Sequence, residues 1–183
     1  MHIRFIVMVL AALIAAASTP ALAQTAPDHA PWQVKAREVY ARIIGFRTAA
    51  AEHQTAAMAG WLGDVLKAGG VPPEDIATLQ AGGATAMIVR IPGSTPARPI
   101  LFSAHMDVVD ARPADWQRDP FTLIEEGGYF FGRGTTDNKA GVAALVSTIL
   151  RFKAEHLRPA RGLVFAFVGD EETGMETTAA IAA

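Results

Sequence analysis

The chain has 183 residues, of which 51% are hydrophobic and 19% are charged, a composition typical of a globular protein with a buried core. The formal net charge of −2 does not indicate a polyanionic partner, so binding to nucleic acid is not expected. The sequence contains no cysteine, which excludes disulfides, thiolate catalysis and cysteine-rich zinc sites. Any bound metal must therefore be held by histidine and carboxylate side chains.

The N-terminus has the pattern of a secretory signal peptide. A short basic segment and an apolar run over 5–17, too short to span a bilayer comfortably, precede an A-x-A motif at 21–23. We expect residues 1–23 to be removed and the product to be exported, either periplasmic or secreted, with no stable membrane span. An uncleaved membrane anchor is the alternative. Residues 24–31 are expected to form a linker.

Beyond the linker, apolar residues recur three and four positions apart in three segments, which predicts amphipathic helices. These expected helices cover 32–46, 56–68 and 139–155.

Short apolar runs between turn residues predict the strands. The expected strands are 76–79, 86–91, 99–104 and 163–168, with a hairpin formed by 121–124 and 129–131. The strands 99–104 and 163–168 are continuously apolar and then end abruptly in polar residues, as buried strands do when they deliver ligands at their carboxyl ends. Strands that alternate with helices indicate an α/β fold with a mixed β-sheet flanked by helices.

The first polar cluster is His105 and Asp107. The two residues are two positions apart, so on an extended strand end their side chains lie on the same side. A metal-bound imidazole usually donates its other N–H to a carboxylate, and Asp107 is well placed to accept it. Alone this pair is weak evidence, because a surface histidine near an aspartate is more common than a metal site.

The second cluster is the glycine-rich segment 132–139, which contains Asp137 at the start of the long predicted helix. Asp137 could cap that helix, which is the more ordinary role. A carboxylate with two oxygens could instead bridge two metal ions.

The third cluster, Glu171 and Glu172, directly follows a strand without polar interruption. Adjacent acids in a loop are usually only solvated. Here one could bind a metal while the other takes a proton from an attacking water.

Other polar and aromatic residues are less informative. We expect His29, His53 and His156 to face solvent, and Arg133 to meet either a substrate carboxylate or a structural ion pair. Trp116 and Phe121 are expected to pack the loop that supports the site.

Together, four motifs resemble the family of di-zinc peptidases and amidohydrolases that includes aminoacylases, glutamate carboxypeptidases and succinyl-diaminopimelate desuccinylase. The motifs are SAHMDVV (103–109), WQRDPF (116–121), GRGTTDNKAG (132–141) and FVGDEETG (167–174). The resemblance covers roughly residues 32–183. It implies a zinc-exopeptidase-like catalytic domain and a zinc-dependent hydrolase that cleaves peptide or N-acyl-amino-acid amide bonds, of the carboxypeptidase, dipeptidase or aminoacylase type.

The resemblance also implies a role for each cluster. His105 would bind one of two zinc ions, Asp107 would orient it, and Asp137 would bridge the metals, with other divalent metals possible. Glu171 would act as general acid and base, and Glu172 would bind the second zinc. The peptide bond Asp137–Asn138 is expected to be cis. In the implied reaction a water gives its proton to Glu171 and attacks the amide carbonyl, and Glu171 returns the proton to the leaving amine.

The inventory of ligands is incomplete, since each zinc has two protein ligands here and catalytic zinc typically has three plus water. The family supplies a further acid and a late histidine from sequence that follows, together with a lid domain. Residues 32–183 are therefore interpreted as the N-terminal portion of a catalytic domain truncated before the lid, with a homodimer possible only in the full-length parent. An exposed apolar sheet edge is expected.

Two other functions remain open at this point. The first is a truncated, non-catalytic fragment with weak or no metal binding. The second, an exported binding module without chemistry, is disfavoured because a pure binder has no use for a general base.

Overall fold

The computed structural model describes residues 30–183. The predicted signal peptide (1–23), His29 and most of the predicted linker lie outside the described residues. Within 30–183, none of the helices has both the length and the apolar character needed to cross a bilayer.

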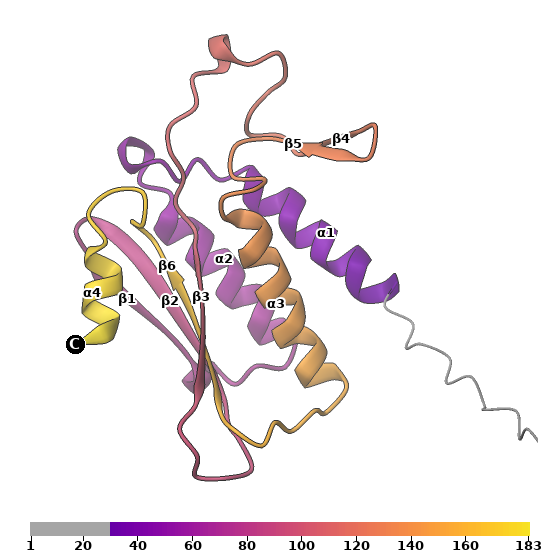
Figure 1. Cartoon of the computed structure of the whole chain (residues 1–183), viewed down its shortest axis with the longest axis vertical. Helices are drawn as coiled ribbons and strands as arrows, with labels where there is room; N and C mark the ends of the chain where they lie inside the picture. The colour runs from indigo at the N-terminus through magenta and orange to yellow at the C-terminus, as the bar shows by residue number, and fades with distance from the viewer. Residues whose placement is uncertain (1–29) are drawn as a thin grey trace, which may run out of the picture.

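A four-stranded mixed sheet forms the centre of the molecule (Figure 1). Its strands are β1 (Ile76–Ala81), β2 (Ala84–Ile91), β3 (Ile100–His105) and β6 (Leu163–Val168), in the order β1-β2-β6-β3. β2 pairs antiparallel with both β1 and β6, whereas β3 and β6 run parallel. In that parallel pair His105 lies opposite Val168, so both strands end at the same edge of the sheet.

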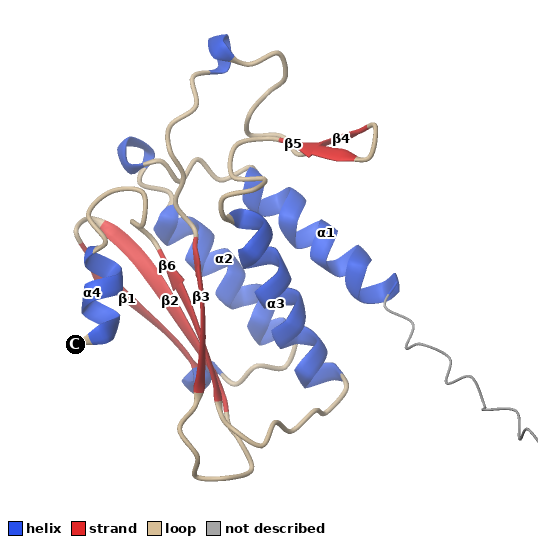
Figure 2. Cartoon of the chain, in the orientation of Figure 1, coloured by secondary structure: helices blue, strands red, loops and turns tan. Residues whose placement is uncertain are grey.

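Helices cover the sheet on two sides (Figure 2). They are α1 (Ala30–Ile44), α2 (Thr55–Ala68), α3 (Lys139–Ala154) and α4 (Glu176–Ala182). α2 packs against β2 and α3 against β3, while α1 forms an outer layer on α3. The short α4 packs against β1 and β2 on the other side of the sheet in Figure 1. The expected mixed sheet flanked by helices is therefore confirmed.

The main core lies between the sheet and α2 and α3. Because successive side chains of a strand point to opposite faces, every second residue of β2 and β6 enters this core. The most deeply buried of these are Met87, Val89, Phe165 and Phe167, each at most 1% exposed. Burial of one such side chain stabilises the fold by about 1.5–3 kcal/mol. The core thus fixes the two strand ends that carry the polar clusters.

Several predicted boundaries differ from the structure: β1 and β2 are each two residues longer than expected, and the hairpin and α1 are shifted. The hairpin forms from β4 (Ile124–Glu126) and β5 (Tyr129–Phe131), not from 121–124. The cause is Asp119, whose carboxylate accepts hydrogen bonds from the Phe121 N–H and the Thr122 hydroxyl, so this segment forms a turn. α1 begins at Ala30 and ends at Ile44, two residues earlier at each end than expected.

Candidate metal centre

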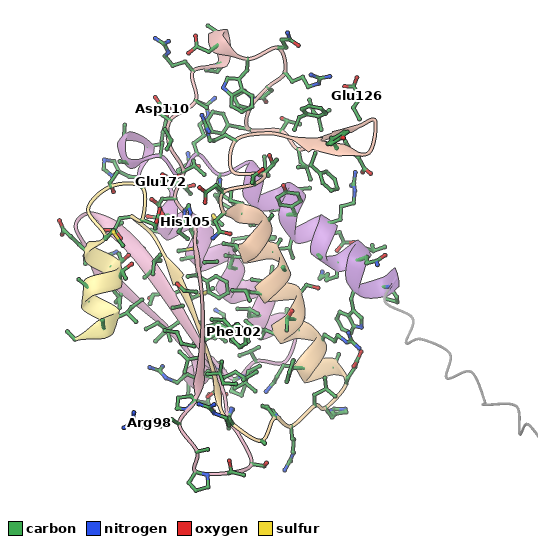
Figure 3. The ribbon with its side chains drawn as sticks, in the orientation of Figure 1. Arg98, Phe102, His105, Asp110, Glu126 and Glu172 are labelled. Atoms are coloured by element: carbon green, nitrogen blue, oxygen red, sulfur yellow. The ribbon has the colours of Figure 1, made fainter. Side chains whose placement is uncertain are left out.

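His105 is the last residue of β3, and its side chain is 6% exposed. Its Nε2 atom lies 2.7 Å from Oδ1 of Asp137. Its Nδ1 atom lies 3.0 Å from the carbonyl oxygen of Asp107. Both ring nitrogens are therefore held in place, and Nε2 faces the carboxylates at the edge of the sheet. Figure 3 places His105 at this end, near Glu172.

Asp107 is 3% exposed and lies beside the imidazole. Its Oδ2 atom accepts a hydrogen bond of 2.9 Å from the backbone N–H of Glu172. Its buried Oδ1 atom lies 3.5 Å from His105 Nδ1, a long contact. Two acceptors of Asp107, its carbonyl and its carboxylate, thus face His105, and the carbonyl is the closer. The carboxylate also fixes the loop that carries Glu172.

Mutual stabilisation shifts the pKa values of both residues. Hydrogen bonding to Asp107 raises the pKa of His105 to about 9, against the effect of burial, and the bond to Asp137 adds to the rise. Burial alone would raise the pKa of Asp107. Hydrogen bonds from His105 and from the backbone N–H groups of Glu172 and Glu171 outweigh burial and keep that pKa below its usual value. Asp107 is therefore a stable carboxylate, as expected of a residue that supports a metal-bound histidine.

Asp137 lies in the turn before α3, and its side chain is 72% exposed. The alternative role as a helix cap does not apply, because the cap position belongs to Asn138 and makes no side-chain cap bond within the described residues. The Asp137 carboxylate is turned onto His105 instead. The Asp137–Asn138 peptide bond is cis, as the family resemblance implied.

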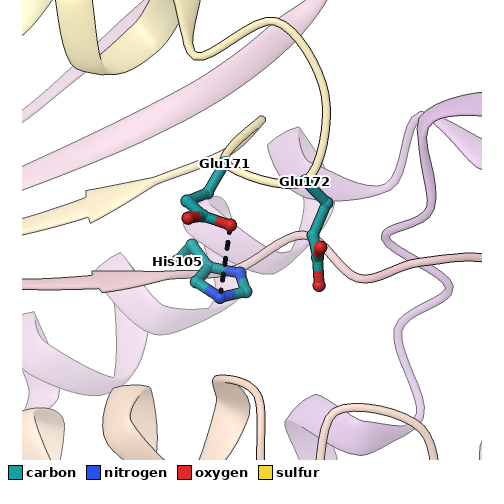
Figure 4. A group of neighbouring side chains, drawn as sticks. All are labelled: His105, Glu171 and Glu172. Atoms are coloured by element: carbon teal, nitrogen blue, oxygen red, sulfur yellow. Dashed lines mark ion pairs between the residues drawn. The ribbon is translucent and has the colours of Figure 1, made fainter.

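Glu171 and Glu172 lie in the loop after β6, and both extend toward His105 (Figure 4). Oε2 of Glu171 lies 3.8 Å from His105 Nε2. One ligand atom from each of the three residues lies within 4.8 Å of the others. The parallel register of β3 and β6 therefore brings the first and third clusters together, and the contact of Asp137 with His105 adds the second.

These side chains fit a zinc ion. Imidazole nitrogen and carboxylate oxygen are ordinary zinc ligands, and bonds of about 2.0–2.2 Å in a tetrahedral site put ligand atoms roughly 3.3–3.6 Å apart. The two proposed ligands of one ion, His105 Nε2 and Asp137 Oδ1, are 2.7 Å apart, so a small outward movement of either side chain would admit the metal. Oε2 of Glu171 lies 3.8 Å from the same Nε2 atom, beside this position.

Sequence reasoning missed two buried charges beside the site. Asp170 is 5% exposed, and its carboxylate accepts hydrogen bonds from the backbone N–H groups of Glu176 and Thr177 at the start of α4. Its position six residues before a helix could have suggested this anchoring role. Lys139 is 0% exposed and opens α3. The sequence offered no signal for its burial, because a lysine at the start of a helix is ordinary.

The remaining candidates have structural contacts. His53 and His156 are exposed, as expected. Arg133 forms no ion pair in the described part of the chain; it lies 5.3 Å from the ring of Trp116 and donates to the carbonyl of Asp110. Phe121 lies under Arg47. These aromatic contacts hold the loop between β3 and β4, which agrees with the supporting role expected for Trp116 and Phe121.

A recess of about 100 Å³ adjoins Asp107. The turn between β1 and β2, the segment around His53 and the loop around Asp170 form its other walls. At roughly 30 Å³ for each liquid water, the recess has room for a few waters or one small chemical group.

Comparison with known proteins identifies the same family as the motifs. Residues 101–183 match the model of peptidase family M20/M25/M40. The chain is 41% identical over 76 residues to a succinyl-diaminopimelate desuccinylase of Polaromonas naphthalenivorans, and 51% identical over 63 residues to a probable succinyl-diaminopimelate desuccinylase of Staphylococcus aureus. These alignments cover 41% and 33% of this chain but only 19% and 16% of the relatives.

Solved structures share the fold over most of the chain. Human carnosine dipeptidase 1 matches with a TM-score of 0.69 at 22% identity, over 84% of this chain and 36% of that protein. The M20 family metallo-carboxypeptidase Sso-CP2 of Sulfolobus solfataricus matches with a TM-score of 0.65 at 20% identity, over 75% of this chain and 31% of that protein. The matched segment, residues 101–183, includes all five side chains predicted for the metal centre.

Proposed function

We propose that this chain supplies part of the active site of a zinc-dependent hydrolase that cleaves amide bonds in peptides or N-acyl amino acids. The observation that carries the proposal is the convergence of His105, Asp137, Glu171 and Glu172 at the carboxyl ends of β3 and β6. The names of the relatives agree on the reaction class, since desuccinylases, dipeptidases and carboxypeptidases all hydrolyse amides.

The proposed ligands are His105 through Nε2, Asp137 as the bridging carboxylate, and Glu172. A bound zinc would polarise the scissile carbonyl and lower the pKa of a water. Asp107 keeps the imidazole oriented through its carbonyl and carboxylate oxygens. The same carboxylate holds the Glu172 backbone, so one buried acid positions ligands from two loops.

Glu171 is the proposed general acid and base. Its carboxylate is 45% exposed and reaches to 3.8 Å from His105 Nε2, so it is open to substrate and close to the metal ligands. It would accept a proton from the attacking water as the new carbon–oxygen bond forms. It would then deliver that proton to the departing nitrogen as the carbon–nitrogen bond breaks.

The proposed substrate carries a free carboxylate near the scissile amide, as in a dipeptide, a peptide C-terminus or an N-succinyl amino acid. Support comes from the relatives, whose names include substrates of this kind. Within this group, a carboxypeptidase-like or dipeptidase substrate is the proposal.

We also propose that the protein is exported after cleavage before Gln24. The support is the signal-peptide pattern of residues 1–23. Mass spectrometry of the protein recovered from culture medium and periplasm tests this. A mature N-terminus at Gln24 is expected, and an intact N-terminus retained in the cytoplasm would contradict it.

The hydrolase proposal is tested with the purified protein that contains this sequence, zinc, and a panel of dipeptides, N-acetyl amino acids and N-succinyl amino acids. We expect hydrolysis that is lost with a chelator and with Glu171→Gln. Glu74→Gln is the matched control, because Glu74 is an exposed acid in the 3-10 helix before β1. Hydrolysis that survives both chelation and Glu171→Gln would contradict the proposal. So would a wild-type chain that neither binds zinc nor hydrolyses any member of the panel.

A further inference from the structure

Lys139 is among the largest fully buried side chains of the described residues, with 0% exposure. Burial of an ammonium group is costly unless its hydrogen bonds are satisfied. Its Nζ atom donates a hydrogen bond of 2.6 Å to the carbonyl oxygen of Phe46 and forms no ion pair in the described part of the chain. A neutral side chain would avoid this cost, so the position of the charge calls for an explanation.

The surroundings of Lys139 leave the side chain little freedom. Its backbone N–H donates to the carbonyl of Gly134, and the lysine stem passes directly beneath that glycine. Gly134 has a φ of +85°, and a Cβ atom there would lie 3.1 Å from Cδ of Lys139. The glycine-rich loop therefore packs directly against the lysine stem and covers it.

The acceptor of this hydrogen bond belongs to a segment that also holds the other half of the site. Phe46 and Thr48 lie in the loop after α1. The Thr48 hydroxyl donates 2.7 Å to the carbonyl of Met106, the residue between His105 and Asp107. The segment 46–48 is thus bonded on one side to the start of α3 and on the other side to the end of β3.

Electrostatics link the same groups. Burial lowers the pKa of Lys139 to about 7, and the negative charge of Asp107 opposes this effect. The buried ammonium therefore lies within range of the field of the carboxylate that supports His105.

We propose that Lys139 is a positioning residue of the metal centre: its bond to Phe46 O braces segment 46–48 and so fixes the Asp137 turn against His105. This inference rests on the proposed function, because the positioned groups are the proposed zinc ligands. Two hydrogen bonds, from Lys139 and from Thr48, meet in one short segment and join the two loops that must supply ligands to the same ion. Lys139 acts through these ligands and does not itself bind the metal.

The test compares Lys139→Met with Ser147→Ala. Ser147 lies on the same helix, is 7% exposed, and donates to a backbone carbonyl of α1, that of Trp32, away from the site. Ser147→Ala therefore removes a comparable hydrogen bond between α3 and α1, and it leaves segment 46–48 untouched. Two readouts are taken at one fixed pH: the ¹⁵N signals of the His105 ring in the metal-free protein, and zinc affinity by calorimetry.

We expect Lys139→Met to alter the Nε2 signal of His105, which reports the bond to Asp137, and to weaken zinc binding by about 10- to 100-fold, the usual cost of losing a supporting contact. Thr48→Val should shift both readouts in the same direction. Ser147→Ala should lower stability and leave both unchanged. Lys139→Arg, which keeps a cationic donor, should recover part of the affinity.

A His105 signal and zinc affinity that stay at wild-type values in Lys139→Met would overturn the inference, as would equal changes in Ser147→Ala. If Lys139→Met does not fold, Lys139→Arg is compared with Ser147→Ala: a lower zinc affinity in Lys139→Arg supports the inference, and an equal affinity overturns it. If even the wild-type chain binds no zinc, the proposed function fails. The NMR comparison of the metal-free proteins still decides the role of Lys139.

Discussion

Nε2 of His105 lies 2.7 Å from Oδ1 of Asp137, a residue 32 positions further along the chain. The contact joins the end of β3 to the turn before α3, with the loop of Glu171 and Glu172 alongside. A zinc ion bound by this imidazole would replace the proton of the hydrogen bond between His105 and Asp137. The metal-free protein thus already holds two proposed ligands next to each other, which reduces the cost of ordering the site on binding.

Replacement of the histidine is the simplest test of ligand identity. His105→Asn should lower zinc affinity by more than about 100-fold, because losing a ligand costs more than losing one of its supporting residues. The measurement is a zinc titration by calorimetry. His156→Asn is the control, since His156 is exposed beyond the C-terminus of α3, and it should bind zinc as the wild type does. Equal losses in the two variants would argue against a site at His105.

Asp107 should matter through orientation rather than through direct binding. In Asp107→Asn the side chain keeps its size but loses the charge that faces His105 Nδ1 and the Glu172 N–H. We expect a loss of about 10- to 100-fold in zinc affinity, with the stoichiometry unchanged. Calorimetry measures both quantities. An affinity equal to that of the wild type would show that the carbonyl of Asp107 alone orients the imidazole.

The raised pKa of His105 predicts a specific pH dependence in the metal-free protein. The pKa is about 9 in the folded chain, against an ordinary value of 6.5, so folding favours the protonated ring. Its stabilising contribution is fully present below the unfolded pKa of about 6.5 and is lost as the pH rises through about 9. The difference in unfolding free energy between wild type and His105→Asn should therefore shrink as the pH rises over this range. Urea titrations in the presence of a chelator measure it, and a difference that grows with pH would contradict the assignment.

Asp170 should contribute to stability. Its buried carboxylate accepts bonds from two backbone N–H groups of α4 and from the hydroxyl of Thr177. Asp170→Asn removes the charge and places the NH2 group of the amide against groups that are themselves hydrogen-bond donors. The expected loss is about 1–3 kcal/mol of unfolding free energy, measured in urea. Glu74→Gln is again the control and should leave stability unchanged; an equal loss there would show that the effect is not due to the hydrogen bonds of Asp170.

The outer edge of β3 should promote self-association. In the described sheet β3 pairs only with β6, and its Leu101 is 60% exposed. Unpaired edge strands with apolar side chains are templates for pairing with other chains, and lysine on an edge opposes this. Leu101→Lys should reduce the apparent mass in concentrated solution, measured by light scattering, without changing zinc affinity. If the wild type associates and Leu101→Lys has the same apparent mass as the wild type, the contact lies elsewhere.

Much of the fold follows from local patterns. Continuous apolar runs located β6 with its observed bounds, and β3 to within one residue. Helical periodicity located α2 and α3 equally well. The hairpin was misplaced because hydrophobicity at Phe121 hides the turn that Asp119 imposes. The apolar pattern of a sequence indicates which residues are buried. A hydrogen bond from a side chain to the backbone can form a turn instead, and so decides where a strand starts.

The candidate site was predicted from strand ends, and its geometry depends on pairing that no local pattern contains. The parallel register of β3 and β6 brings His105 to Glu171, and this register is set by the core as a whole. The role of Lys139 was not predicted because a lysine at a helix start is ordinary in sequence. Only its burial and its bond to Phe46 distinguish it.

The most direct test of the central claim is a crystal of the zinc-loaded chain measured on both sides of the zinc absorption edge. We predict an anomalous peak about 2.0–2.2 Å from Nε2 of His105 and from a carboxylate oxygen of Asp137. A zinc peak confined to exposed histidines such as His53 or His156, with His105 still bonded to Asp137, would contradict the account.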